Sequence, residues 1–337
     1  MPKVTNAFST YMAQGNREDL SSAIYNIDPF DTPVMSAIRR RNVKNRFFDW
    51  QTEHLPSVAP ASISGAVAPN AQIEGFVLAP GPSTPTVRVQ NATQISERDA
   101  TVTGSQEESD AAGKSSEMAH QMAMASKVLK SDIETALCSR QARNDGVDGT
   151  TARVTEGLTH AIATAVARGG STAGGAVAPG TAGSGTGTGL PATSYAAFAV
   201  PAAVALTEQM VGDAMQMAYT NGASPTLLVV PPGPKRTIST FVGRSTTQVL
   251  VGKTEVVSTV DVIATDFGRV KCIPSRWVPA DVGLLIDPDY AALAFFRSFK
   301  QYLMARTGDA EQRMIVVEWG VETRNGLAHV LFNGITP

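Results

Sequence analysis

Histidine is the residue of this sequence with the widest chemical repertoire, because imidazole binds metals and transfers protons near neutral pH. The four histidines, His54, His120, His160 and His329, lie in separate segments. None belongs to an HExxH pair or to another short ligand spacing. We therefore expect His120 and His329 to be structural, and we expect no metal and no cofactor.

Two glycine-containing runs resemble catalytic loops without meeting their requirements. Residues 252–254 (Gly-Lys-Thr) match the end of a phosphate-binding loop, but Thr247 stands where that loop needs its first glycine. Residues 183–185 (Gly-Ser-Gly) lack the earlier glycine of a nucleophile elbow, since Ala182 stands there. The carboxylates are scattered, apart from the adjacent pair at 107–108. These patterns do not predict an enzyme.

A basic run is the strongest charge feature. It places five positive charges within eight residues: Arg39, Arg40, Arg41, Lys44 and Arg46. Such a run is often only a solvated cluster, but it could also contact phosphate or an acidic neighbouring subunit. The net charge of −2 argues against a dedicated nucleic-acid-binding protein.

The composition is that of a globular protein, with 43% hydrophobic and 17% charged residues in 337. This length suggests about two folding units with a substantial core. We expect Cys138 and Cys272, far apart in sequence, to be reduced core residues. The sequence shows no signal peptide and no apolar run long enough to span a membrane.

Residues 114–143 are predicted to form one long helix, the spine, around which the chain is organised. Apolar residues recur there at spacings of three and four and so share one face. The expected packing face consists of Met118, Met122, Leu129, Ile133 and Leu137. Asn144-Asp145-Gly146 provides a stop signal.

The segment before the spine is predicted to be extended. Residues 1–46 have the pattern of an arm with short helical turns, one of them at 33–38. Residues 47–51 are predicted to form a strand, and 87–95 its return partner. The connection between them is rich in proline and almost uncharged. A two-stranded excursion of this kind requires a partner surface, because an isolated hairpin is marginally stable in water.

The segment after the spine alternates between helical and strand patterns. Residues 150–280 are predicted to form a mixed α/β unit that contains a glycine-rich connection at 169–189. Residues 281–337 are predicted to return to sheet. Within them, 314–323 alternates strongly, and Asn325-Gly326 predicts a hairpin turn into a return strand at 327–332.

This order of elements, together with particular runs, resembles the major capsid protein of tailed phages, which has the Hong Kong 97 type of fold. Each run is short, but their order covers nearly the whole chain. The runs are residues 16–33, 91–96, 102–104, 117–123, 129–134, 235–241, 265–268 and 305–309.

The resemblance implies an α+β shell subunit with a defined division of the chain. It implies an N-terminal arm at 1–46, an extended loop at 47–98, a peripheral domain with the spine helix at 99–149, an axial domain at 150–280 and the closing sheet of the peripheral domain at 281–337. Copies are expected to form the hexamers and pentamers of an icosahedral virion head that encloses double-stranded DNA without reading its sequence. Assembly in the host cytoplasm is implied, with a portal, a separate scaffolding protein and an optional decoration protein as partners.

One departure from some relatives is informative. They join neighbouring loops by a lysine–asparagine cross-link, whereas residues 47–98 contain no lysine. This loop therefore cannot donate the lysine, and loop and arm contacts must hold the shell. In this setting we favour a neighbouring subunit as the contact of the basic run. The alternative is an encapsulin-like nanocompartment shell, which shares the fold but encloses an enzyme cargo.

Overall fold

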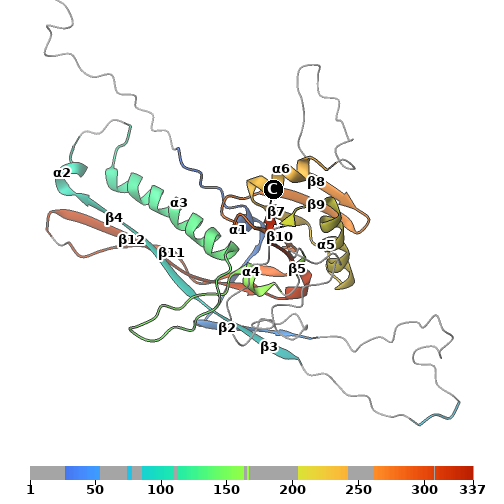
Figure 1. Cartoon of the computed structure of the whole chain (residues 1–337). Helices are drawn as coiled ribbons and strands as arrows, with labels where there is room; N and C mark the ends of the chain where they lie inside the picture. The colour runs from blue at the N-terminus through green and yellow to red at the C-terminus, as the bar shows by residue number, and fades with distance from the viewer. Residues whose placement is uncertain are drawn as a thin grey trace, which may run out of the picture.

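The computed structural model describes residues 27–53, 74–77, 86–109, 113–162, 165–166, 204–241, 261–306 and 308–336. Within these residues the chain is α+β, and two large sheets share one apolar core with the longest helix, α3 (Glu117–Cys138). Figure 1 shows α3 lying along one sheet, while the second sheet and its helices occupy the other side of the molecule.

The first sheet has four strands in the order β1-β11-β12-β4. Its strands are β1 (Arg39–Asn42), β11 (Ala291–Leu303), β12 (Ala310–Thr323) and β4 (Gln94–Thr103). Along β12, Ile315, Val317, Trp319 and Val321 point to one face and pack in the core that includes α3. The alternation predicted for 314–323 is therefore confirmed, because a strand turns alternate side chains to opposite faces.

The second sheet has six strands in the order β5-β13-β10-β7-β9-β8. They are β5 (Ala165–Val166), β13 (Val330–Asn333), β10 (Val282–Ile286), β7 (Leu227–Val230), β9 (Gly268–Pro274) and β8 (Val262–Thr265). Helices α5 (Glu208–Thr220) and α6 (Pro232–Ser239) pack on one face through a second apolar cluster. The small elements are α1 (Pro33–Ala37), α2 (Gly104–Glu107), α4 (Leu158–Ala161), η1 (Gly326–Ala328) and the paired β6 (Val204–Ala205) and β14 (Ile335–Thr336).

Strands β2 (Phe47–Thr52) and β3 (Val87–Ala92) pair in antiparallel fashion as a two-stranded sheet, which we call the loop ribbon. The predicted pairing of these two strands is therefore confirmed. The predicted return strand 87–95 is broken, however, because Thr93 separates β3 from β4, which belongs to a different sheet. In Figure 1 the loop ribbon projects below the four-stranded sheet.

The spine is shorter than the predicted 114–143 at both ends. It begins after Ser116, whose hydroxyl accepts a hydrogen bond from the Ala119 N–H at 3.1 Å, as expected of an N-cap. It ends at Cys138, beyond which the chain packs tightly against a later segment. A Cβ on Gly157 would lie only 2.4 Å from the Ser139 carbonyl oxygen, and the Gly157 N–H donates to the Gln141 carbonyl at 2.8 Å.

The hairpin predicted at Asn325-Gly326 is wrong. Strand β12 already pairs with β11 on one side and β4 on the other, so no edge remains for a return strand. The Asn325 side chain instead accepts a hydrogen bond from the Leu327 N–H at 3.0 Å and caps η1. The chain then enters β13 in the six-stranded sheet.

Residues 281–337 return to sheet, as expected, and supply strands to both large sheets. Strands β11 and β12 belong to the four-stranded sheet, whereas β10 and β13 lie in the centre of the six-stranded one. The turn predicted at 33–38 corresponds to α1, and most of the run 235–241 lies in α6, which begins at Pro232. The glycine-rich connection predicted at 169–189 and residues 1–26 of the predicted arm lie outside the described residues.

Candidate assembly surfaces

The residues of the predicted spine packing face all lie in the apolar core. Met118 and Met122 are almost fully buried, and Leu129, Ile133 and Leu137 are completely buried. They share one cluster with the inward face of β11 and β12. This face of α3 therefore stabilises the subunit itself and is not exposed to a neighbour.

A buried carboxylate on the spine fixes the point where the amino-terminal segment joins the body. The two oxygens of Glu134 accept hydrogen bonds from the Val34 N–H at 2.8 Å and the Met35 N–H at 2.7 Å. Helix α1 has no side-chain cap of its own, so Glu134 satisfies its first free N–H groups. Burial raises the pKa of Glu134, and the two backbone donors oppose this shift.

The predicted basic run coincides largely with β1, and two of its members are neutralised within the subunit. Arg39 contacts Asp289 at 2.6 Å, and both side chains are exposed. Arg41 contacts Glu322 at 2.6 Å, and Arg324 contacts the same carboxylate at 2.9 Å. The Glu322 side chain is only 2% exposed, so it requires these two cations.

The remaining members of the run are more accessible to a partner outside the subunit. Arg40 and Lys44 are exposed, and neither forms an ion pair with another described residue. The Arg46 guanidinium lies 5.0 Å from the centre of the Phe47 ring and so belongs to the start of the loop ribbon. Within the described residues, the run therefore divides into arginines paired inside the subunit and the exposed Arg40 and Lys44.

The loop ribbon is seated on the face of the four-stranded sheet opposite α3. Phe48 packs with Val43 and Ala294 in a small apolar cluster, with Trp50 alongside at a ring distance of 5.9 Å. The contact depends on a glycine in β12, because a Cβ on Gly320 would lie 2.6 Å from the Phe48 ring. We call this packing of Phe48 against the sheet the apolar seat of the ribbon. It cannot be predicted from the sequence, since one glycine in a strand does not identify its neighbour.

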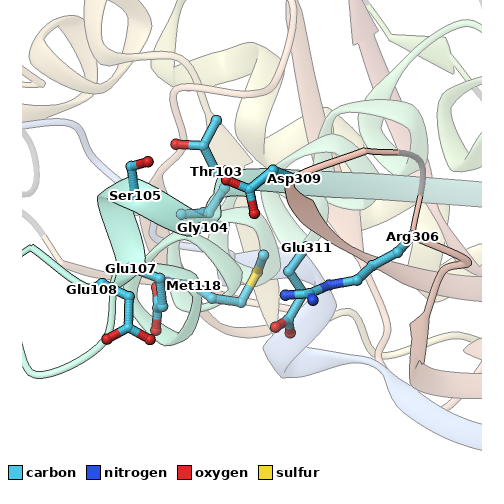
Figure 2. Close-up of a pocket in the computed structure, with 10 residues that line it drawn as sticks. Thr103, Gly104, Ser105, Glu107, Glu108, Met118, Arg306, Asp309 and Glu311 are labelled. Atoms are coloured by element: carbon cyan, nitrogen blue, oxygen red, sulfur yellow. Dashed lines mark hydrogen bonds between the residues drawn. The ribbon is translucent and has the colours of Figure 1, made fainter.

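The adjacent carboxylates at 107–108 border an open cavity of about 570 Å³, where the ends of β4 and α2 meet the β11–β12 connection (Figure 2). Arg306, Asp309 and Glu311 line its other side. The Glu107 carboxylate accepts from the Ser116 hydroxyl at 2.6 Å and the Met118 N–H at 3.0 Å, and these bonds lower its pKa. Glu107 therefore acts as part of the cap of α3, and an ionised, hydrogen-bonded carboxylate is a poor proton donor.

The three histidines in the described part of the chain have different surroundings. His329 is fully buried; its Nδ1 accepts from the Asp287 N–H at 3.2 Å, and burial lowers its pKa to about 4. His160 contacts Glu156 at 2.7 Å, whereas His120 is half-buried on α3 and His54 lies outside the described residues. Across the described ranges, no group of three or more His, Cys, Asp or Glu side chains is placed to hold a metal ion.

Cys138 and Cys272 are both free and buried, as predicted, and burial raises the pKa of each thiol. In the described ranges, no helix combines the length and apolar character needed to cross a bilayer.

The buried carboxylates Glu134, Glu318 and Glu322 are the main polar features that the sequence analysis did not identify. Glu318 accepts from both Arg153 and Arg297, at 2.6 and 2.9 Å. In the sequence, each of these glutamates has the pattern of a solvent-facing position of a helix or strand. Only the folded chain brings their partners together.

Comparison with known proteins relates the chain to phage shell subunits. Residues 3–336 match the SU10 major capsid protein family. The major capsid protein of Escherichia phage Phieco32 is 27% identical over 347 residues, which cover 96% of each chain.

Solved structures show the same fold at low sequence identity. A chain of the Cyanophage A-1(L) capsid asymmetric unit has a TM-score of 0.62 at 15% identity, covering 98% of this chain and 99% of that one. A chain of the holo-SrpI encapsulin complex of Synechococcus elongatus PCC 7942 has a TM-score of 0.53 at 10% identity, covering 95% and 92%. The fold is therefore Hong Kong 97-like, as the resemblance implied, and it is common to phage capsids and to this encapsulin.

Proposed function

The chain belongs to the SU10 major capsid protein family and is a structural subunit of a tailed-phage icosahedral head rather than an enzyme; on this premise we propose that it assembles as hexamers and pentamers joined by its arm and extended loop. The observation that carries the proposal is the family match over residues 3–336. The match includes the arm and the loop as well as the two large sheets. The segments that need partners are therefore shared with the family.

The division of the chain follows from this proposal. Residues 1–46 are the arm, 47–98 the extended loop, 99–149 the peripheral domain with the spine, and 150–280 the axial domain. The sheet order supports two adjustments: residues 94–98, as part of β4, belong with the peripheral domain, and from 281–337, β11 and β12 belong with the peripheral domain and β10 and β13 with the axial domain. The loop ribbon supports the loop assignment, because its two strands pair only with each other within the described residues.

For the basic run, the proposed partner remains an acidic surface of a neighbouring subunit. Arg40 and Lys44 are its available members, since Arg39 and Arg41 are paired with carboxylates of their own subunit. Charge reversal at Arg40 is expected to weaken assembly of empty particles if the contact is protein, and to affect only DNA-filled heads if it is phosphate. The corresponding reversal at Arg39 is the matched control on the same strand.

The partners outside the shell are proposed more generally. Double-stranded DNA is enclosed without sequence-specific contacts, which suits a subunit with a net charge of −2. A portal, a separate scaffolding protein and an optional decoration protein complete the expected set. No cofactor is proposed.

Electron microscopy of the purified, recombinantly expressed protein, with size-exclusion chromatography alongside, tests the proposal. Closed shells, tubes or capsomer rings are the expected result. A subunit that remains monomeric even with a scaffolding partner would contradict it.

The encapsulin-like shell is the second candidate, and the fold match to the SrpI encapsulin is the observation in its favour. The family match favours the phage head. An enzyme co-purifying inside small shells of uniform size, or a cargo-enzyme gene adjacent to this one, would reverse that preference.

A further inference from the structure

The base of the loop ribbon contains a concentration of polar contacts that the shell function described above does not explain. Strand β3 ends at Ala92 and β4 begins at Gln94, so the chain passes from a two-stranded sheet to a four-stranded one across the single residue Thr93. A one-residue junction between two sheets, without other contacts, would be a flexible hinge. Here, the polar groups of Thr93 are all hydrogen-bonded.

The polar groups of Thr93 contact three parts of the subunit, and its hydroxyl also lies 3.1 Å from the Arg46 carbonyl oxygen that accepts its N–H. Its N–H donates to the Arg46 carbonyl at 2.8 Å, just before β2. Its hydroxyl donates to Glu318 on β12 at 2.8 Å, and its carbonyl accepts from Arg153 at 3.2 Å. The direction of the chain at this junction is therefore determined by three separate elements.

The carboxylate of Glu318 links these contacts together. One of its oxygens accepts from Thr93 and from Arg153 at 2.6 Å, and the other accepts from Arg297 on β11 at 2.9 Å. Glu318 is only 2% exposed, and a buried carboxylate makes strong, geometrically demanding hydrogen bonds. It thus fixes Thr93 in relation to two strands of the sheet.

A second arginine from the segment after the spine holds the paired strands themselves. Arg143 donates to the Gln90 carbonyl at 2.9 Å and to the Gln90 side chain at 2.8 Å, and its guanidinium lies 5.4 Å from the centre of the Phe47 ring. It therefore contacts both β3 and β2 at the end of the ribbon nearest the body.

Asn91 completes the arrangement from inside. Its side chain donates to the Val321 carbonyl at 2.6 Å and accepts from the Glu156 N–H at 3.2 Å. At 2% exposure, this amide ties β3 to β12 and to the segment before α4.

We propose that these five residues, Asn91, Thr93, Arg143, Arg153 and Glu318, form a polar lock that sets the direction in which the loop ribbon leaves the body, and thereby the angle at which one subunit engages the next. The proposal rests on the function proposed above, in which the loop contacts a neighbouring copy. Because the angle between neighbours determines shell curvature, the lock residues are positioning residues for particle size. The apolar seat at Phe48 holds the ribbon against the sheet, and the lock sets its direction.

Hydrogen exchange on the subunit before assembly tests the lock directly. Thr93→Val keeps the shape of the side chain and removes the donor to Glu318, whereas Thr93→Ser keeps the donor and is the matched control. We expect ribbon amides to lose about tenfold in protection in Thr93→Val, as for the loss of one hydrogen bond to a charged group. Spine amides are expected to be unchanged, which separates a local lock from a general loss of stability.

Particle size provides the second readout. After assembly, Thr93→Val is expected to give a broader or shifted distribution of diameters, with wild-type diameters in Thr93→Ser. Unchanged ribbon protection in Thr93→Val would overturn the proposal, as would lost protection with normal diameters. If Thr93→Val does not fold, Arg143→Met replaces it, since it removes only the guanidinium contacts. Failure of wild-type protein to form particles would count against the proposed function, whereas the exchange result concerns the lock alone.

Discussion

The spine helix and the loop ribbon lie on opposite faces of the same four-stranded sheet and are held there by different interactions. The spine buries Leu129, Ile133 and Leu137 completely against the inward face of β11 and β12. The ribbon rests on a small cluster around Phe48, and its base is tied down by hydrogen bonds and buried charges. Apolar burial stabilises the packing of two surfaces but is not directional. Hydrogen bonds are directional, so they also fix the orientation of the segments that they join.

The difference indicates how a shell subunit combines stability with a defined attachment angle. Removing one apolar contact from the spine should weaken the whole fold, because the core is shared by both large sheets. Removing one polar contact at the ribbon should change a local arrangement at a smaller cost, since a single hydrogen bond contributes about 1 kcal/mol.

The largest effect is expected for Leu129→Asp. An unpaired carboxylate would be placed in the fully buried face of α3, at a cost of about 5 kcal/mol or more. Thermal unfolding and electron microscopy should show loss of the folded subunit and of particles. Val128→Asp is the matched control, because that side chain is 42% exposed. Normal particles from Leu129→Asp would refute the spine's role in packing.

A smaller loss of stability is expected at low pH, because of His329. Burial lowers its folded pKa to about 4 from a usual value near 6.5, so the unfolded chain binds this proton more readily. Above pH 6.5 the imidazole is neutral in both states, and its full contribution to the free energy of unfolding is present. As the pH falls towards 4, this contribution is lost, and the loss reaches about 3 kcal/mol.

Denaturant unfolding at several pH values measures this contribution. His329→Gln, which keeps an acceptor for the Asp287 N–H, should be less sensitive to pH than wild type across that range. An identical pH dependence in the two proteins would show that another group is responsible.

Gly320→Ala tests the apolar seat of the ribbon. The new methyl group would lie 2.6 Å from the Phe48 ring, so the ribbon must shift, at a cost of about 2 kcal/mol. Gly212→Ala in α5 is the contrasting control, because among the described residues the added carbon meets no atom within 4 Å beyond its own stretch of helix, and alanine favours a helix by about 1 kcal/mol. Thermal midpoints should therefore move in opposite directions. An unchanged thermal midpoint in Gly320→Ala would show that Phe48 packs less closely against Gly320 than the structure indicates.

The smallest effects are expected within the basic run, where burial of the partner decides the outcome. Arg41→Ala removes one of two cations from the buried Glu322 and should cost about 1–2 kcal/mol. Arg39→Ala breaks a pair exposed on both sides and should cost less than about 1 kcal/mol. Chemical denaturation of the two variants in parallel measures the difference, and equal losses would contradict this ranking.

Local patterns predicted the elements whose burial follows a simple period. The three- and four-residue spacing identified the spine and its packing face, and the alternation in 314–323 identified the inward face of β12. The two strands of the ribbon were also predicted from their composition, with the right partner. In each case the signal lies within the segment itself.

The remaining features depend on contacts between distant segments. Asn325-Gly326 is a strong hairpin signal, but β12 has no free edge, so the chain continues to another sheet. The strand predicted at 87–95 breaks at Thr93 because the polar groups there are bound by Arg46, Arg153 and Glu318. The buried glutamates resemble surface residues in sequence, because their arginine partners come from other elements.

The placement of strands from the carboxyl-terminal segment has a consequence for the order of folding. Trp319 on β12 bonds to Ser96 on β4, 223 residues earlier, and β10 and β13 occupy central positions in the other sheet. Contacts so distant in sequence close large loops and form slowly. Neither large sheet can be completed during synthesis until residues beyond Ala310 have left the ribosome. A nascent chain stalled before that point should remain sensitive to protease, so that a subunit becomes competent to join a shell only once it has been fully made.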